Sequence, residues 1–168
     1  YLQAIAIKPD YAEAHSDLGA ALHELGELDE AVARYRQALA IRPDHAEVHH
    51  NLGNALRDQG LLADALNSQR RAVALKPGDD FLWAGLAATV ERVSFSAADE
   101  DLCRDLLQLL ARPTVRPYDV APAILGALRH LPQFASVVAE WEAAEAAEAN
   151  NPIAFADMDR RLSAIPLL

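Results

Sequence analysis

The sequence is poor in the residues that build disulfides, cysteine-based metal sites and β-structure. A single cysteine, Cys103, stands among 168 residues, which excludes an internal disulfide and favours a reducing compartment. Glycine accounts for only 7 residues, and neither an Asn-Gly nor an Asp-Gly hairpin turn occurs. Because 52% of the residues are nevertheless hydrophobic, we expect a packed helical protein rather than a disordered chain.

Basic charge is also scarce. Lys and Arg number 15 against 25 for Asp and Glu, and the formal net charge is −10. Nucleic acids and anionic membranes both attract proteins through Lys and Arg, so this balance argues against either as a partner. No run of 18 apolar residues occurs and no charged-then-apolar leader opens the chain. The composition therefore predicts a cytoplasmic location.

What the sequence does contain is a period of 34 residues, which separates Pro9 from Pro43 and Pro43 from Pro77. A fixed period of this length is typical of proteins built from stacked structural repeats. The residues that recur in register are Leu18 and Leu52, Gly19 and Gly53, Leu22 and Leu56, Gly26 and Gly60, Ala31 and Ala65, and Ala38 and Ala72.

The period and these residues resemble the tetratricopeptide repeat, a helix–turn–helix unit of 34 residues. His15 and His49 replace the family's Trp, and the polar Gln69 stands where the first unit has the aromatic Tyr35. The small residues that let the two helices approach closely are retained. The resemblance implies an all-α fold, a right-handed α-solenoid in which the first helix of each unit lines a concave surface.

The repeat register divides the chain into five segments. Because the chain begins inside a hairpin and lacks an initiating Met, we interpret it as a fragment of a larger bacterial protein. Trp83 restores the family's Trp in a third, degenerate unit. The expected segments are the second half of a preceding repeat (1–11), two full units (12–45 and 46–79), the degenerate hairpin (80–113) and a helical C-terminal extension (114–168) with helices at 119–131 and 132–149 and from residue 151.

Local signals predict where the helices of each unit begin and turn. Asp10 followed by Glu13, and Asp44 followed by Glu47, have the spacing of a capping box at the start of a helix. Gly26 and Gly60 are expected to form the turns between paired helices, where a positive φ favours glycine.

Residues on the first helices are the candidate binding residues. The segment HHNLGNAL resembles the asparagine-bearing repeats of O-linked N-acetylglucosamine transferases, in which a groove asparagine holds the main chain of an extended peptide. The resemblance implies that role for Asn51, whose carboxamide offers both a donor and an acceptor. The alternative is a solvated consensus residue. The nominated groove residues are Glu13, Ser16, Asp17, Ala20 and Glu24 in the first unit, Glu47, His50, Asn51, Asn54, Arg57 and Asp58 in the second, and Phe81, Ala84, Gly85, Ala88 and Arg92 in the third.

Acidic residues predominate among these candidates. Glu13, Asp17 and Glu47 are opposed mainly by Arg57 and Arg92, so the surface should repel an acidic C-terminal tail. The expected partner is a neutral or basic extended peptide, or a protein that presents one.

Signals for catalysis, metals and cofactors are weak. His45 and His49 are four residues apart on one helix, but no suitable third ligand follows, so no metal site is predicted. The sequence has no Gly-rich phosphate loop, no Gly-x-Ser-x-Gly elbow and no histidine close to Cys103. We therefore predict no catalytic residues and no cofactor in this chain.

Three functional hypotheses remain. The first is a protein-interaction module that binds a peptide or protein in its concave groove. The second is a non-catalytic recruiting arm of a larger enzyme, because the segment from Asp105 to Phe134 resembles helical stretches that precede S-adenosylmethionine-dependent methyltransferase or glycosyltransferase domains. The third is a self-assembling scaffold, a homo-oligomer formed through the open ends of the solenoid.

Overall fold

The computed structural model describes residues 8, 10–95, 100–112, 114–115, 117–134 and 138–139. In this part of the chain it has seven α-helices, one 3-10 turn and no strand, which confirms the predicted all-α class. The chain divides into two compact units, residues 1–89 and residues 90–168.

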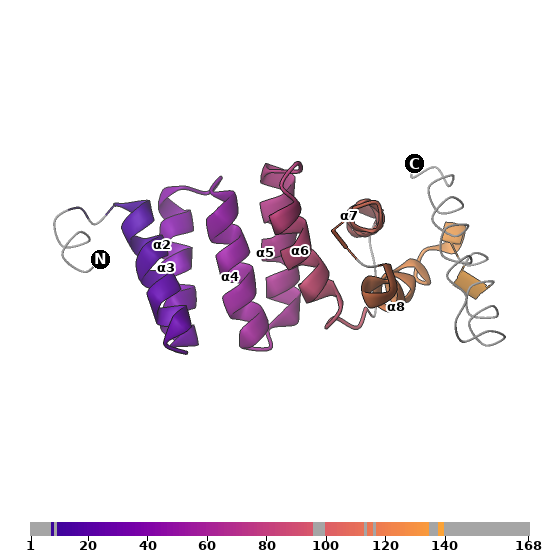
Figure 1. The fold of residues 1–168 in the computed structure, drawn as a ribbon, viewed down its shortest axis with the longest axis horizontal. Coiled ribbons are helices and arrows are strands. Elements are labelled where there is room, and N and C mark those ends of the chain that lie inside the picture. Colours follow the sequence, from indigo (N-terminus) through magenta and orange to yellow (C-terminus); the bar gives the residue numbers. More distant parts are fainter. Residues whose placement is uncertain are drawn as a thin grey trace. The chain divides into compact units, whose positions relative to one another are not determined.

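The first unit consists of stacked helical hairpins (Figure 1). Helices α2 and α3 pack against each other as one hairpin, α4 and α5 as the next, and α3 contacts α4 so that the two hairpins are stacked. A further helix, α6, follows them. The bounds are α2 Ala12–Glu24, α3 Leu28–Ile41, α4 Ala46–Asp58, α5 Leu62–Leu75 and α6 Asp80–Val90.

Glycine forms both inter-helix turns, as predicted. Gly26 and Gly60 each have a φ of 80°, the left-handed region that residues with a Cβ rarely adopt. In the first turn the Glu27 N–H donates to the Leu22 carbonyl at 2.9 Å, and in the second the Leu61 N–H donates to the Leu56 carbonyl at the same distance. These bonds satisfy carbonyls that the end of each helix would otherwise leave without a donor.

The two helices of each hairpin approach most closely at a second pair of glycines. A Cβ on Gly19 would lie 2.9 Å from the ring of Tyr35, and a Cβ on Gly53 would lie 2.8 Å from Nε2 of Gln69. Both distances are shorter than a carbon side chain tolerates. Glycine therefore lets the large residue of the second helix lie against the backbone of the first, as the repeat pattern predicts.

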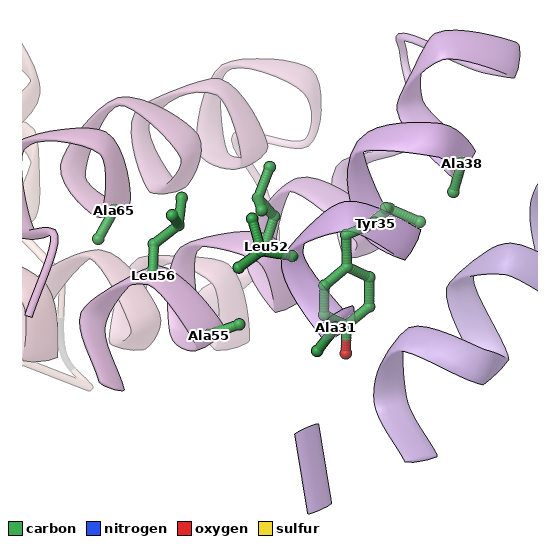
Figure 2. Close-up of a cluster of buried hydrophobic side chains, with 9 residues drawn as sticks. Ala31, Tyr35, Ala38, Leu52, Ala55, Leu56 and Ala65 are labelled. Atoms are coloured by element: carbon green, nitrogen blue, oxygen red, sulfur yellow. The ribbon is translucent and has the colours of Figure 1, made fainter. Parts of the chain in front are cut away.

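Apolar burial joins one hairpin to the next. Figure 2 shows side chains of α3, α4 and α5 meeting in a common cluster, in which Tyr35 is 1% exposed and burial raises its pKa to about 12. Removing this apolar surface from water is the main force that stacks the hairpins. The cluster consists of Ala31, Val32, Tyr35, Ala38, Val48, Leu52, Ala55, Leu56 and Ala65.

Histidine replaces the family's tryptophan by reproducing its hydrogen bond. The indole N–H of Trp83 donates to the Pro77 carbonyl at 2.9 Å. At the same repeat position, Nε2 of His49 lies 2.8 Å from the Pro43 carbonyl. A carbonyl only accepts hydrogen bonds, so the His49 ring must carry its proton on Nε2. The substitution at position 49 thus preserves the link between α4 and Pro43.

The predicted capping boxes are wrong. Helix α2 has Tyr11 at its N-cap and α4 has His45, and neither position makes a side-chain capping hydrogen bond. Each helix begins one residue later than expected, so Asp10 and Asp44 are out of register with its first amide groups. The third unit differs, because the carboxylate of Asp79 accepts the backbone N–H of Phe81 at 3.0 Å.

The second unit contains α7 Glu100–Leu110, α8 Pro117–Leu128 and a 3-10 turn at Pro132–Phe134. Helix α7 contacts α8, and Leu102, Leu106 and Leu109 of α7 are buried. The predicted helix at 119–131 is present as α8, two residues earlier at its start because Pro117 suits the first helical turn. Most of the helix predicted at 132–149, and all of the one from residue 151, lie outside the described residues.

No helix among the described residues is long and apolar enough to cross a membrane.

We expect Gly60→Ala to lower the free energy of unfolding by about 1 kcal/mol, because alanine is strained in the left-handed region. Gly60 has open space around it, so backbone strain is the only cost. Urea unfolding monitored by circular dichroism measures the change. Gly78→Ala is the matched control, since Gly78 also has open space but no positive φ, and its stability should not fall. Equal stabilities for the two variants would contradict the prediction.

Candidate functional site

The predicted binding residues of the first two units lie on α2 and α4, the first helices of neighbouring hairpins, which contact each other directly. Glu13 and Asp17 are on α2, and six lie on α4: Glu47, His50, Asn51, Asn54, Arg57 and Asp58. The fold therefore brings together residues about 34 positions apart in the sequence. Their surroundings divide them into three groups: members of ion pairs, members of a buried network, and residues with uncommitted polar atoms.

Glu13 and Glu47 belong to a repeated ion pair. Glu13 pairs with Arg42 and Glu47 with Lys76, and each pair joins the start of a first helix to the C-cap of the second helix in the same hairpin. The hydrogen bond from Lys76 holds the pKa of Glu47 below its usual value. The pKa of Glu13 is also lowered, mainly by a backbone hydrogen bond and next by the hydrogen bond from Arg42. Both carboxylates are therefore compensated within their own hairpin.

Asp58 takes part in a link between hairpins, and Arg57 lies next to it. Asp58 Oδ2 lies 2.8 Å from Nε2 of His23, which joins the end of α4 to the end of α2. Arg57 Nε is 3.9 Å from the other Asp58 oxygen. Beside them, Gln59 donates from Nε2 to Asp29 at 2.7 Å. Both carboxylate oxygens of Asp58 therefore have a basic neighbour.

His50 is buried rather than presented on an open surface, which corrects its placement as a groove residue. It is 4% exposed, because the ring of Phe81 from α6, the first helix of the next unit, lies over it at a centroid distance of 4.6 Å. Gly85 on the same helix makes room for it, since a Cβ there would lie 2.4 Å from the His50 ring. The next unit thus covers a side chain that α4 alone would expose.

His50 belongs to a hydrogen-bonded network with Gln69 and Asn54. His50 Nδ1 lies 3.1 Å from Gln69 Oε1, and Asn54 Nδ2 lies 2.9 Å from His50 Nε2. Gln69, which is 0% exposed, donates from Nε2 to Asn54 Oδ1 at 3.0 Å and to the His50 carbonyl at 3.3 Å. We call these three side chains the Gln69 network. Its hydrogen bonds satisfy polar atoms at a position where the first hairpin has an aromatic ring.

The two candidate asparagines differ in how far they are committed. Asn54 is half-buried, and its oxygen and one N–H are used within the Gln69 network. Asn51 is also half-buried but makes no hydrogen bond to another side chain in the described part of the protein. Its whole carboxamide is therefore available to a partner.

Sequence reasoning noted the polar Gln69 but did not connect it with its partners. The signal was present, because the positions equivalent to His50, Asn54 and Gln69 in the first hairpin are Ser16, Ala20 and Tyr35. All three positions differ between the two units. The first unit has two small residues and an aromatic residue there, whereas the second has three polar side chains that hydrogen-bond one another. Their contact depends on the packing of α4 on α5, which periodicity alone does not specify.

The pattern of the units matches known sequence families. Residues 1–26 and 21–60 match a TPR repeat model, and residues 46–79 match a tetratricopeptide repeat model. This is a tetratricopeptide-repeat protein. No curated protein matches its sequence.

Two solved structures are similar to this tetratricopeptide-repeat protein. One is a mutant O-GlcNAc transferase of Thermobaculum terrenum, 28% identical with a TM-score of 0.56, and the match covers 66% of this chain and 21% of the transferase. The chain thus spans about a fifth of the length of that enzyme. The other is MamA, 16% identical with a TM-score of 0.61 and 88% coverage of both chains, a likeness of fold.

The histidines of the repeats show no grouping for a metal. Within the described residues, no set of three or more His, Cys, Asp and Glu side chains is placed to hold an ion. His49 Nε2 is hydrogen-bonded to the Pro43 carbonyl, and His45 Nδ1 lies 3.1 Å from Glu47 Oε2.

We expect the stability of the repeats to fall as the pH is lowered through the range in which His50 titrates. Burial, and secondarily Arg57, lower the pKa of His50, while Gln69 and Asp79 oppose this change. Unfolded His50 therefore binds a proton at a higher pH than folded His50. Its contribution to stability is complete above the unfolded pKa of about 6.5 and is lost below it as the pH approaches the folded value.

Urea unfolding of the wild type and of His50→Leu over this pH range measures the effect. His49, whose pKa burial also lowers, contributes in the same direction in both proteins. The difference between the two pH profiles therefore isolates His50. The variant should be less stable at neutral pH but should lose less stability on acidification. Parallel profiles would show that His50 is not the responsible group.

Proposed function

We propose that the surface formed by α2, α4 and α6 binds, in the cytoplasm, the main chain of an extended peptide, with Asn51 as its principal contact. Tetratricopeptide repeats are generally protein–protein interaction modules, so the class of partner is a protein. The observation that carries the finer proposal is the uncommitted carboxamide of Asn51, placed on a first helix among polar side chains that are bonded to one another.

A carboxamide suits this role chemically. It can donate to a peptide carbonyl and accept from the neighbouring peptide N–H, so it binds the main chain without selecting its side chains. Support also comes from the resemblance of this segment to the asparagine-bearing repeats of O-GlcNAc transferases and from the 28% identity with one such enzyme. Asn54 lies three residues further along the same helix, where the two side chains are neighbours on one face.

The charges on this surface favour a neutral or basic peptide. Glu13 and Glu47 are paired with basic side chains, which reduces the negative charge that the sequence alone suggests. Asp17 is exposed and makes no ion pair with the described residues. Asp17 therefore gives this surface a small negative charge that no basic side chain among the described residues offsets. Such a surface disfavours an acidic peptide but does not require a strongly basic one.

Replacing Asn51 tests this proposal. A suitable probe is a linear peptide with blocked ends, selected on this protein from a random library. Asn51→Ala should weaken its binding by about tenfold, the effect of losing two hydrogen bonds to the main chain. Fluorescence anisotropy of the labelled peptide measures the dissociation constant, and urea unfolding should show unchanged stability.

Asn67→Ala provides the matched control, because Asn67 is an exposed asparagine on the second helix of the same hairpin. Its affinity for the peptide should equal that of the wild type. Wild-type affinity in Asn51→Ala as well would place the binding surface elsewhere.

The transferase match favours a second candidate function, a recruiting arm of a larger enzyme. The similar region makes up only 21% of that transferase, so the repeats occur there beside a much longer remainder. Sequencing the reading frame beyond both ends of this chain tests the idea. An adjoining catalytic domain of the glycosyltransferase or methyltransferase type would support it, whereas further repeats alone would remove it.

A further inference from the structure

We propose that Gln69 is a positioning residue of the peptide site: through His50 it holds Asn54 in one orientation, and protonation of His50 releases Asn54 and weakens peptide binding. This inference rests on the proposed function and adds to it a residue that the peptide never touches. It also gives the site a dependence on pH.

The orientation of the whole network follows from one backbone carbonyl. The side-chain atom of Gln69 that faces the His50 carbonyl must be the nitrogen, because two carbonyl oxygens repel each other. That nitrogen also faces Asn54, so the Asn54 atom nearest to it must be the oxygen. The amide nitrogen of Asn54 is thereby directed at His50.

The same reasoning fixes the proton of the His50 ring. Because the Asn54 nitrogen donates to His50 Nε2, that ring atom must be unprotonated. Because Gln69 Oε1 accepts a hydrogen bond from Nδ1, the ring proton must be on Nδ1. The network is complete only with neutral His50 in this one tautomer, in which the ring N–H, the two Gln69 bonds and one Asn54 N–H all have acceptors.

This arrangement determines what Asn54 offers to a peptide. One N–H bonds to His50 and the oxygen accepts from Gln69, so the second N–H is the donor that remains. The oxygen also keeps one lone pair, so Asn54 presents one donor and one acceptor site, and the network fixes the direction of each. Asn51 can turn, whereas Asn54 holds these two sites in place as long as the network is intact.

Protonation of His50 disrupts this arrangement. A proton on Nε2 would face the Asn54 N–H, so two donors would meet. Turning the Asn54 carboxamide over would satisfy His50 but would set its nitrogen against Gln69 Nε2, another donor. Asn54 must therefore leave the network when His50 is charged.

The charged surroundings of His50 are few. Arg57, on the same helix, opposes protonation, and Asp79, ahead of α6, favours it. The residues that face His50 from α5 and α6 are Gln69 and Phe81, neither of which titrates. Burial is the main influence on the pKa of His50, and the hydrogen bond to Gln69 acts against it.

Two substitutions of Gln69 test the network by NMR of the His50 ring nitrogens. The wild type at about pH 7.5 should show the neutral Nδ1–H tautomer. Gln69→Glu keeps the size of the side chain but supplies two acceptors, so it should raise the pKa of His50. Gln69→Met removes the hydrogen bonds and should abolish the tautomer preference. His49, held by Pro43, should be the Nε2–H tautomer in all three proteins. An Nε2–H tautomer for His50 in the wild type would overturn the proposal.

The effect on binding is measured with the library-selected peptide. Its affinity for the wild type should fall by about tenfold from pH 7.5 to well below the pKa of His50, as one or two hydrogen bonds are lost. In Gln69→Glu a turned-over Asn54 can donate to the new carboxylate and accept from charged His50, so this fall should be absent. Tyr35→Phe is the matched control, since it changes the same repeat position in the first hairpin and should leave the profile unaltered.

The outcomes separate the two proposals. A flat affinity profile together with the expected His50 titration overturns the positioning role and leaves the proposed function standing. Unchanged affinity in Asn51→Ala, together with a wild-type fall that is lost in Gln69→Glu, overturns the assignment to Asn51 and supports Gln69. If the library yields no linear peptide that binds at any pH tested, both proposals are wrong.

Discussion

The close approach of the two helices in each hairpin is the constraint on which the first unit depends. Gly19 and Gly53 remove the Cβ that would collide with the large residue opposite, so that residue lies directly against the first helix. Its side chain then fills the space between the helices, and the apolar residues around it are left to pack against the next hairpin. The stacking of hairpins and the alignment of α2 beside α4 both follow from this contact.

The same constraint explains why a polar residue at this position has consequences. Tyr35 fills its space with an aromatic ring, whereas Gln69 fills the equivalent space with a carboxamide that must be hydrogen-bonded when fully buried. His50 and Asn54 provide those bonds. On α6, Gly85 leaves room for the His50 ring and Phe81 covers it. Gln69, a residue of the buried contact between α4 and α5, is therefore hydrogen-bonded to Asn54 on the surface proposed to bind peptide.

Surface charge is arranged by the repeat as well. The pairs Glu13–Arg42 and Glu47–Lys76 occupy equivalent positions in consecutive hairpins and tie together the two ends of each. Exposed pairs of this kind contribute little to stability, but they remove charge from the first helices. The local balance near Asn51 is consequently less acidic than the net charge of −10 suggests, which is why a neutral main chain is a suitable partner.

The sequence by itself determined the all-α class, the helical hairpins and the two turn glycines, because these depend on a period and on local backbone preferences. It did not determine the helix starts, since a shift of one residue takes Asp10 and Asp44 out of capping register. Nor did it determine that His50 is buried or that it bonds to Gln69, because a ring from α6 covers it and a side chain from α5 reaches it. Contacts between residues of different helices decide which polar groups remain available, and those contacts exist only in the tertiary structure.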